Sequence, residues 1–570
     1  MPSNQNGTTR MMRRYGPFGL IVVVVLVIAL VTVMVGGGDD DGDSSSNGEV
    51  KSEDELIRAG PMTPQKAELL GRDDIDFGPD CDTELGTVAI PTVYAPPCVE
   101  PFEGDNGGAT SPGVTKDKVK IVRYAADPAL DPLLASQISA AGADVSPESA
   151  GVTAEGYIDL YEQYFETYGR EIDFETYTGT GASDDEQAAK ADAQAIAEKE
   201  PFAVLGGPTQ AARVFADELA ADGILCIGFC ALAIPEEFSK ERRPYIWNVG
   251  PTPDQAARLA AEMIGKLAPP GKAEFAGDPE IQQQDRVYGI AHYDTPDGSQ
   301  SSVFALQKEE LAKYDIDIET DAEFFLELAR AQENARTIIT KFKDAGVTTI
   351  IYTGDPITPS SLTAEATAQE YFPEWILGQS VLADIAVFGR LNDAQWKNGF
   401  GISLPAGRAE EETTNSYRLY QWFTGSPPPN NTYGVINPDV SYVMRCIHLA
   451  GPKLTPETCR DGFYRIPPSG GGPTNPTTSW GDHGFWPGID TAATDDATII
   501  WWDPTAEGEN EIGQNGLGLY RYANGGKRYK LGEFPSRAES GLHDVANSVT
   551  IYDTRPPEDT PPDYPSPAGG

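Results

Sequence analysis

Six cysteines are the residues whose spacing points most directly to chemistry in this 570-residue chain. They form three pairs that are close in sequence: Cys81 with Cys98, Cys226 with Cys230, and Cys446 with Cys459. An even number of cysteines outside the cytoplasm favours disulfides, and proximity favours these local pairs among the many possible connectivities. A zinc site is the alternative, although only four histidines and no C-x-x-C motif are present. Cys226 and Cys230 can bridge only if the chain turns between them.

Motifs of the common catalytic sites are absent from the sequence. There is no G-x-S-x-G, H-E-x-x-H or P-loop motif, and no glycine-rich dinucleotide fingerprint follows the first expected strand. Four scattered histidines leave little for general acid–base chemistry, although carboxylates could replace them. We therefore predict a protein that is not an enzyme and needs no cofactor, with a carboxylate-based enzyme as the less favoured alternative.

One acidic stretch could supply oxygen ligands to a calcium ion, through Asp503, Glu507, Glu509 and Glu511. Oxygen-rich loops are common in so acidic a chain, so we interpret these carboxylates as solvated and predict no metal site.

The charge balance restricts the partners. The chain has 42 Lys and Arg against 87 Asp and Glu, and 42 − 87 gives a net charge of −45. Such a chain repels phosphate backbones, so we exclude nucleic acid as a partner. Hydrophobic residues make up 40% of the sequence, which is enough for a large core, and the length predicts more than one domain.

The N-terminal region predicts a membrane anchor. Arg10, Arg13 and Arg14 precede an uncharged apolar run from Phe18 to Val35. At about 1.5 Å per residue in a helix, this run spans a hydrocarbon core, and the arginines place the N-terminal side in the cytoplasm. We predict a cytoplasmic tail at 1–16 and a transmembrane signal anchor at 17–36. The protein would then be a single-pass protein of the cell membrane with most of the chain outside; a cleaved signal peptide is the alternative.

Three further segments have distinctive composition. Residues 37–112 are expected to form an acidic tether followed by an extension closed by cysteines. Residues 553–570 are rich in proline and are expected to form a disordered tail. The segment 467–490 is rich in Gly, Pro and Thr, and its role stays open between covering a cleft and having no function.

The main body alternates short β-branched runs with amphipathic stretches, which predicts parallel sheets covered by helices. In the first part we expect strands at 119–122, 171–177, 202–205 and 224–229 and helices at 154–168, 188–198 and 211–221. In the second part we expect strands at 287–292 and 348–352 and helices at 253–266, 301–313 and 334–345. Two such units predict two α/β lobes, whose strand ends would border a ligand cleft.

Several of these segments resemble one protein family. The matching stretches are Gly113-Val114-Thr115 before Val119-Lys120-Ile121, then 168–172, 244–248, Tyr293-Asp294 with Gly298, and 448–458. In this order they resemble type I periplasmic binding proteins, the substrate-binding proteins of branched-chain amino acid ABC transporters. The segment from Cys81 to Gly113 resembles the leader of membrane-anchored actinobacterial members. The resemblance implies a two-lobe solute-binding domain at 113–552, with lobe 1 at about 113–250 plus 377–490 and lobe 2 at about 251–376 plus 491–552.

The resemblance also implies ligand contacts. In the first lobe they would come from Gly207, Thr209, Gln210, Ala231 and Ala233, and in the second lobe from Tyr293, Asp294, Asp297 and Asp355. Amides and a hydroxyl at strand ends can hold a carboxylate, and an acidic side chain can pair with an ammonium group. A helix N-cap role for Thr209 and Gln210, and solvated loop positions for the aspartates, are the alternatives.

The function that the resemblance implies is capture of a small polar solute, such as an amino acid or amide, for an ABC-type importer with a permease partner. A solute-sensing receptor ectodomain that acts through a membrane partner is the alternative. The expected cytoplasmic tail is too short for an output domain of its own.

Overall fold

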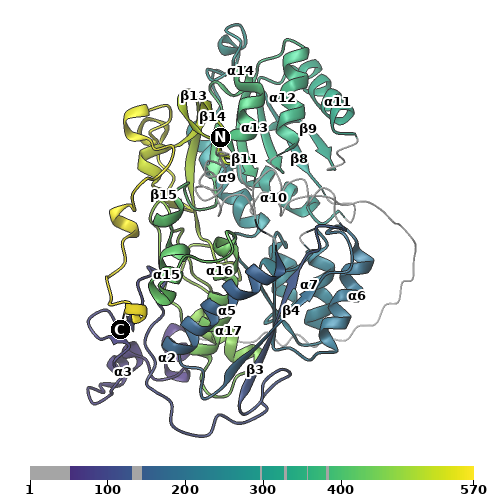
Figure 1. Ribbon diagram of the computed structural model, residues 1–570. Coiled ribbons are helices and arrows are strands. Elements are labelled where there is room, and N and C mark those ends of the chain that lie inside the picture. The colour runs from purple at the N-terminus through teal and green to yellow at the C-terminus, as the bar shows by residue number, and fades with distance from the viewer. Residues whose placement is uncertain are drawn as a thin grey trace, which may run out of the picture.

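In the computed structural model the chain forms two α/β lobes, each built around its own β-sheet (Figure 1). The structure describes residues 52–130, 144, 146–208, 210–294, 298–325, 330–355, 357–380 and 384–569. The expected cytoplasmic tail and membrane anchor lie outside these ranges. Within the described residues, no helix has both the length and the apolar character needed to cross a membrane.

The first lobe is built on a parallel sheet with the strand order β4–β3–β5–β6–β7. Its strands are β3 (Lys118–Ala125), β4 (Glu171–Thr178), β5 (Ala203–Leu205), β6 (Leu225–Gly228) and β7 (Ile246–Asn248). Its helices are α5 (Pro147–Tyr164), α6 (Glu186–Ala197), α7 (Ala212–Ala221), α8 (Glu236–Glu241), α15 (Asn415–Thr424), α16 (Tyr433–Ala450) and α17 (Pro456–Tyr464). Helices cover both faces, so the adjacent residues Ile121 and Val122 are both buried.

The second lobe is built on an eight-stranded sheet with the order β14–β13–β12–β11–β10–β8–β9, and β15 pairs with β13. Its strands are β8 (Tyr288–Tyr293), β9 (Ile318–Phe324), β10 (Thr349–Gly354), β11 (Glu374–Ser380), β12 (Phe400–Ser403), β13 (Asp496–Glu509), β14 (Asn515–Tyr522) and β15 (Arg528–Lys530). Its helices are α9 (Pro253–Leu267), α10 (Ser301–Ala312), α11 (Ala331–Asp344), α12 (Thr358–Ala368), α13 (Ala386–Gly389) and α14 (Asp393–Trp396). The strands from β8 to β12 are parallel, whereas β13 is antiparallel to β12 and to β14.

Both lobes repeat one strand order. In each, the second strand along the chain lies at the edge beside the first, and the third, fourth and fifth follow on the other side. This is a doubly wound order, in which ligands bind beyond the carboxyl ends of the strands. The predicted pair of α/β lobes with mostly parallel sheets is confirmed.

The expected return of the chain to lobe 1 at residue 377 is wrong. Ile376 and Leu377 of β11 pair with Phe400 and Gly401 of β12, so both strands stay in the second sheet. The chain returns only after β12, at α15. No strand was expected at either segment, because their buried apolar runs lie outside the alternation of strands and helices that ends near residue 352.

In the described part of the chain, three connections join the lobes. The connections are 249–252, between β7 and α9; 404–414, between β12 and α15; and 465–495, between α17 and β13. The third lies beside the other two: Ala493 N donates to Asn248 O over 3.1 Å, and Gly407 N donates to Pro473 O over 2.9 Å. The three connections therefore form one hydrogen-bonded hinge region.

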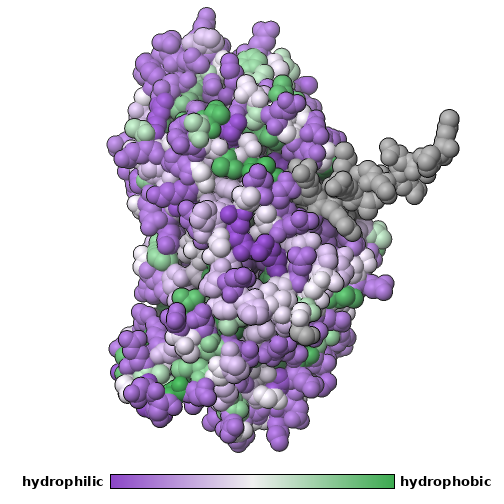
Figure 2. Space-filling view, turned by 60° about the vertical axis from the view of Figure 1, so that its left-hand side comes forward, coloured by the Kyte–Doolittle hydropathy of each residue, from purple (hydrophilic) through white to green (hydrophobic). Residues whose placement is uncertain are grey.

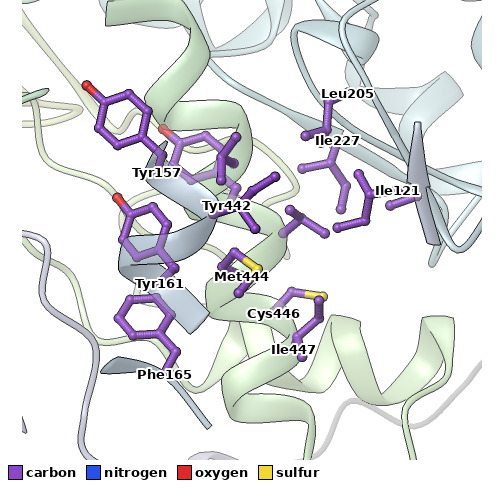
Figure 3. Close-up of a cluster of buried hydrophobic side chains, with 14 of the residues drawn as sticks. Ile121, Tyr157, Tyr161, Phe165, Leu205, Ile227, Tyr442, Met444, Cys446 and Ile447 are labelled. Carbon is purple, nitrogen blue, oxygen red and sulfur yellow. The ribbon is translucent and has the colours of Figure 1, made fainter. Parts of the chain in front are cut away.

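Helix α16 is the centre of the first lobe. Tyr157 and Tyr161 of α5, with Phe165 directly after it, pack on one side of α16, and strand residues including Ile121 pack on the other (Figure 3). The expected disulfides are confirmed, with Cα–Cα distances of 5.7 Å for Cys81–Cys98, 5.3 Å for Cys226–Cys230 and 4.8 Å for Cys446–Cys459. The required turn between Cys226 and Cys230 is made at Gly228, which has a φ of 71°.

The N-terminal extension packs along the first lobe. It contains α2 (Glu53–Ala59), α3 (Pro64–Leu70), β1 (Cys81–Asp82) and β2 (Thr87–Val88). The guanidinium of Arg170 donates to Asn106 O over 2.7 Å and to Pro452 O over 3.0 Å. Arg465 Nε donates to Leu56 O over 2.7 Å. The segment from residue 52 onward is therefore part of the folded body.

The proline-rich C-terminal segment was expected to be disordered, and this is wrong. Asp559 is buried and its carboxylate accepts from Thr474 N over 2.7 Å. Tyr564 OH donates to Asp82 Oδ2 over 2.8 Å, which places the end of the chain beside the extension near α3 (Figure 1). Prolines prevent regular helices and strands, but they do not prevent side-chain hydrogen bonds from fixing a segment.

Candidate functional site

A cavity of about 330 Å³ lies at the hinge region. All three connections between the lobes line it, through residues such as Val249, Leu404 and Thr478. The first lobe contributes α5, α16 and the loop after η2 (Phe229–Ala231), and the extension contributes Tyr94. The segment 467–490, whose role was left open, lines the cavity with 474–476 and 478. Rotation of one lobe against the other would therefore change the shape of this cavity.

The cavity wall is largely apolar and aromatic. Tyrosines line it from the extension, from α5 and from α16, and two of their hydroxyls donate hydrogen bonds. Tyr161 OH donates to Asn437 Oδ1 over 2.7 Å, and Tyr94 OH donates to Pro476 O over 2.8 Å. Burial raises the pKa of Tyr94 and of Tyr161, so both phenols are neutral at physiological pH.

Arg445 on α16 is the one charged side chain among the described residues that line the cavity. Its residue exposure is 4%, and within the described chain its Nε and Nη1 have no hydrogen-bond acceptor. The rings of Tyr94 and Tyr442 lie 5.5 and 5.9 Å from its guanidinium carbon. Burial lowers the pKa of Arg445, but a guanidinium stays protonated in proteins. A permanent cation with unused donors therefore lies in the cavity wall.

Two residues fix the loops around the cavity. Asp439 Oδ1 accepts from Phe229 N over 2.9 Å and so holds the η2 loop, which carries Leu232 and Ala233 to the cavity. Burial raises the pKa of Asp439 to about 7. Arg528 donates to Leu404 O over 2.6 Å and to Pro405 O over 2.7 Å, and so holds the second connection.

Two buried carboxyl groups, Asp490 and Asp495, lie on the third connection. Asp490 Oδ1 accepts from Gln255 Nε2 and from Ala492 N, each over 2.8 Å, and no described group donates to Oδ2. Burial and then repulsion from Asp495 raise the pKa of Asp490 well above its usual value. Burial raises the pKa of Asp495 to about 6, although Ser479 and Trp486 both donate to it.

The raised pKa values of Asp490 and Asp495 predict that the stability of the protein depends on pH. An acid whose pKa is higher in the folded protein than in the unfolded chain stabilises the folded state while it is protonated. This contribution is complete below the unfolded pKa and is lost as the pH rises through the folded pKa. We expect the free energy of unfolding to fall between about pH 5 and about pH 7. Asp490→Asn should weaken this dependence and raise stability near neutral pH, because the amide oxygen keeps both hydrogen bonds and the repulsion is lost.

Urea unfolding at the two pH values checks this prediction. Asp285→Asn, in which an aspartate with 80% side-chain exposure is changed, is the matched control and should behave as the wild type does. A variant Asp490→Asn that is less stable than the wild type near neutral pH would contradict the assignment.

Of the described residues expected to contact a ligand in the first lobe, only Ala233 lines this cavity. Its φ is 55°. Ala231 is fully buried in the core behind the loop. Gly207 packs against Cys230, and Gln210 Nε2 donates to Ser183 Oγ over 2.8 Å, so neither is among the lining residues. Thr209 lies outside the described residues.

The expected second-lobe aspartates have structural partners instead of facing this cavity. Asp294 is buried and accepts from Ser301 Oγ over 2.6 Å, at the start of α10. Asp355 is buried and accepts from Thr358 N over 2.8 Å, at the start of α12. Both carboxylates fix helix starts, and their burial does not agree with a solvated loop position. Tyr293 packs against Phe324, and Asp297 lies outside the described residues.

The carboxylates considered as calcium ligands are not gathered at one site. Asp503 pairs with Arg521 over 2.6 Å, and Glu511 pairs with Arg408 over 2.9 Å. In the part of the chain that the structure describes, no group of three or more His, Cys, Asp or Glu side chains is arranged to hold a metal.

Sequence reasoning missed Arg445 and the tyrosines around it. A signal for Arg445 was present: it lies in an 18-residue helix, and no acidic residue stands three or four positions from it. An arginine inside a buried helix without a partner at helical spacing must find one elsewhere. The aromatic wall carried no comparable signal, because its members come from segments far apart in the sequence.

Comparison with known proteins gave matches only among solved structures. No family model matches the chain, and no curated protein matches it. A fatty acid ABC transporter substrate-binding protein from Thermomonospora curvata is 15% identical and has a TM-score of 0.48, with 76% of this chain and 100% of that one covered. A type 1 periplasmic binding protein from Bordetella pertussis is 12% identical and has a TM-score of 0.45, with 70% and 100% covered. A leucine-, isoleucine-, valine-, threonine- and alanine-binding protein from Brucella ovis is 11% identical and has a TM-score of 0.48, with 77% and 100% covered.

Proposed function

We propose that the protein is a solute-binding protein of the type I periplasmic binding class, which encloses a small molecule at the junction of its two lobes. The observation that carries the proposal is the cavity at the three connections, with the unpaired guanidinium of Arg445 in its wall. Its volume lies at the lower end of the range of about 300–1,000 Å³ for small-molecule sites. A mostly apolar wall with few polar groups is also typical of such sites.

The arrangement of the connections supports capture by a hinge motion. Because the cavity is lined by the segments that join the lobes, a ligand there contacts the elements whose backbone must change when the lobes rotate. A ligand that fits one arrangement of the lobes better than another shifts the population toward it. Delivery to an ABC-type importer through a permease partner is part of the proposal, on the basis of the sequence resemblance.

The three disulfides support a location outside the cell, and the surface suits exposure to water. Hydrophilic side chains cover most of the face in Figure 2, and apolar residues form only small separate patches. A net charge of −45 keeps such a surface hydrated and away from anionic lipid headgroups. Anchoring of the chain by residues 17–36, with most of the protein outside, belongs to the proposal.

The purified full-length protein should be screened for a shift in melting temperature with amino acids, amides, urea, short peptides and carboxylic acids. A ligand present at about 100 times its dissociation constant adds about 2.7 kcal/mol of stability. We expect at least one compound to raise the melting temperature by several degrees and to be recovered unchanged. Chemical turnover of that compound by the protein alone would contradict a purely binding role.

A further inference from the structure

We propose that the solute is a monocarboxylate with an apolar or aromatic body, and that Arg445 binds its carboxylate. The inference rests on the proposed function and names the class of ligand. It starts from the guanidinium, whose Nε and Nη1 face no acceptor in the described chain although the residue is almost fully buried. Carboxylates and phosphates match the planar fork of arginine donors, and a single guanidinium balances the one charge of a carboxylate.

The surroundings of Arg445 favour an external anion. Three other buried guanidinium groups in the described chain are engaged: Arg170 donates to the carbonyls of Thr115, Pro452 and Asn106, and Arg286 and Arg528 each pair with a carboxylate. Around Arg445 the ionisable groups are tyrosines, and burial keeps their hydroxyls neutral. Aromatic rings attract the cation but do not neutralise it.

The rest of the wall selects against an amino acid. None of the described lining residues is Asp or Glu, so the wall offers no carboxylate to pair with an ammonium group. Burying an unpaired ammonium group is costly, whereas apolar atoms gain free energy on leaving water. The lining by Tyr161, Phe229 and Leu404 fits an aromatic or aliphatic body.

The size of the cavity limits the ligand. A cavity of about 330 Å³ lies at the lower end of the range for small-molecule sites, so it favours a small solute. A carboxylate on one ring, or on a medium-length chain, meets this limit. The amino acids and amides expected from the sequence are small enough for this cavity. Their polar groups, however, do not match its mostly apolar wall.

The test uses the full-length protein with benzoate, 3-phenylpropionate and decanoate as probes. Benzamide and phenylalanine are the matched compounds, since the first lacks the charge and the second adds an ammonium group. We expect at least one carboxylate to raise the melting temperature of the wild type and to bind at least tenfold more tightly than the matched compounds. Titration calorimetry measures the affinities.

The decisive variant is Arg445→Met, which keeps a long apolar side chain and removes the donors. We expect it to weaken carboxylate binding by at least tenfold and to leave the melting temperature of the unliganded protein unchanged or higher, because an unpaired buried charge is removed. Arg445→Lys should bind with intermediate affinity. The matched control is Arg170→Met, in which a buried arginine with filled donors is changed; it should lower the melting temperature and leave the affinity unchanged.

The outcomes separate this inference from the proposed function. If amino acids or amides bind and the three carboxylates do not, the ligand class is wrong while solute binding stands. If Arg445→Met lowers the melting temperature as much as Arg170→Met does, Arg445 has a structural role and the inference is wrong. If no compound of either panel binds the wild type, both the inference and the proposed function fail.

Discussion

Glu374→Ala is expected to lower the free energy of unfolding by about 3–5 kcal/mol, because it leaves a buried guanidinium without its partner. Arg286 and Glu374 have side-chain exposures of 2% and 0%. Arg286 Nε donates to Glu374 Oε2 over 2.8 Å, and its Nη2 donates to Oε1 over 3.0 Å. Thr349 Oγ1 donates to the same carboxylate over 2.5 Å. The group thus joins the starts of the central strands β8, β10 and β11.

Urea unfolding measures this loss, and Glu274→Gln is the matched control. Glu274 lies 3.8 Å from the same arginine, but its side chain is 46% exposed. Exposed pairs contribute about 0–1 kcal/mol, so the control should change stability little. A loss below about 1 kcal/mol in Glu374→Ala would show that the pair does not hold the second lobe together.

Arg528→Met should have a comparable effect on stability, about 3–5 kcal/mol, and should also impair solute binding. Arg528 and Asp496 have side-chain exposures of 0% and 2%, and they pair over 2.6 Å. The variant leaves Asp496 unpaired and frees the carbonyls of Leu404 and Pro405, both of which line the cavity. Unfolding experiments measure the first effect, and the melting-temperature shift on adding solute measures the second.

Lys272→Met is the control for this variant, because Lys272 and Asp285 form a surface pair with exposures of 58% and 80%. It should change neither the stability nor the response to solute. If Arg528→Met unfolds at the same urea concentration as the wild type, Arg528 does not hold the second connection.

Much of the fold follows from the local sequence. Apolar β-branched runs alternate with amphipathic stretches, and this alternation alone predicts parallel strands and covering helices. The cysteine pairs are also close enough in sequence to be assigned. The return point between the lobes depends on strand pairing between β11 and β12, which no local pattern specifies, so it was placed too early.

The site was harder to predict for a similar reason. Asp294 and Asp355 stand at strand ends, where a ligand contact is plausible, yet neighbouring helix starts already use their oxygens. The cavity wall combines Tyr94 of the extension, Tyr161 of α5, Tyr442 of α16 and Leu404 of the second connection, which only tertiary packing brings together. The C-terminal tail shows the same limit, since its partner Thr474 is far away in sequence.

The central claim is that a solute is enclosed in the cavity between the lobes. Isothermal titration of the wild type and of Ser441→Phe, with the compound that gives the largest melting-temperature shift, tests it most directly. Ser441 lines the cavity one helical turn before Arg445, so a phenylalanine there fills the space and leaves the guanidinium in place. We predict one binding site in the wild type and at least a tenfold weaker one in a folded Ser441→Phe variant. Equal affinity in the two proteins would place the solute elsewhere and contradict the account.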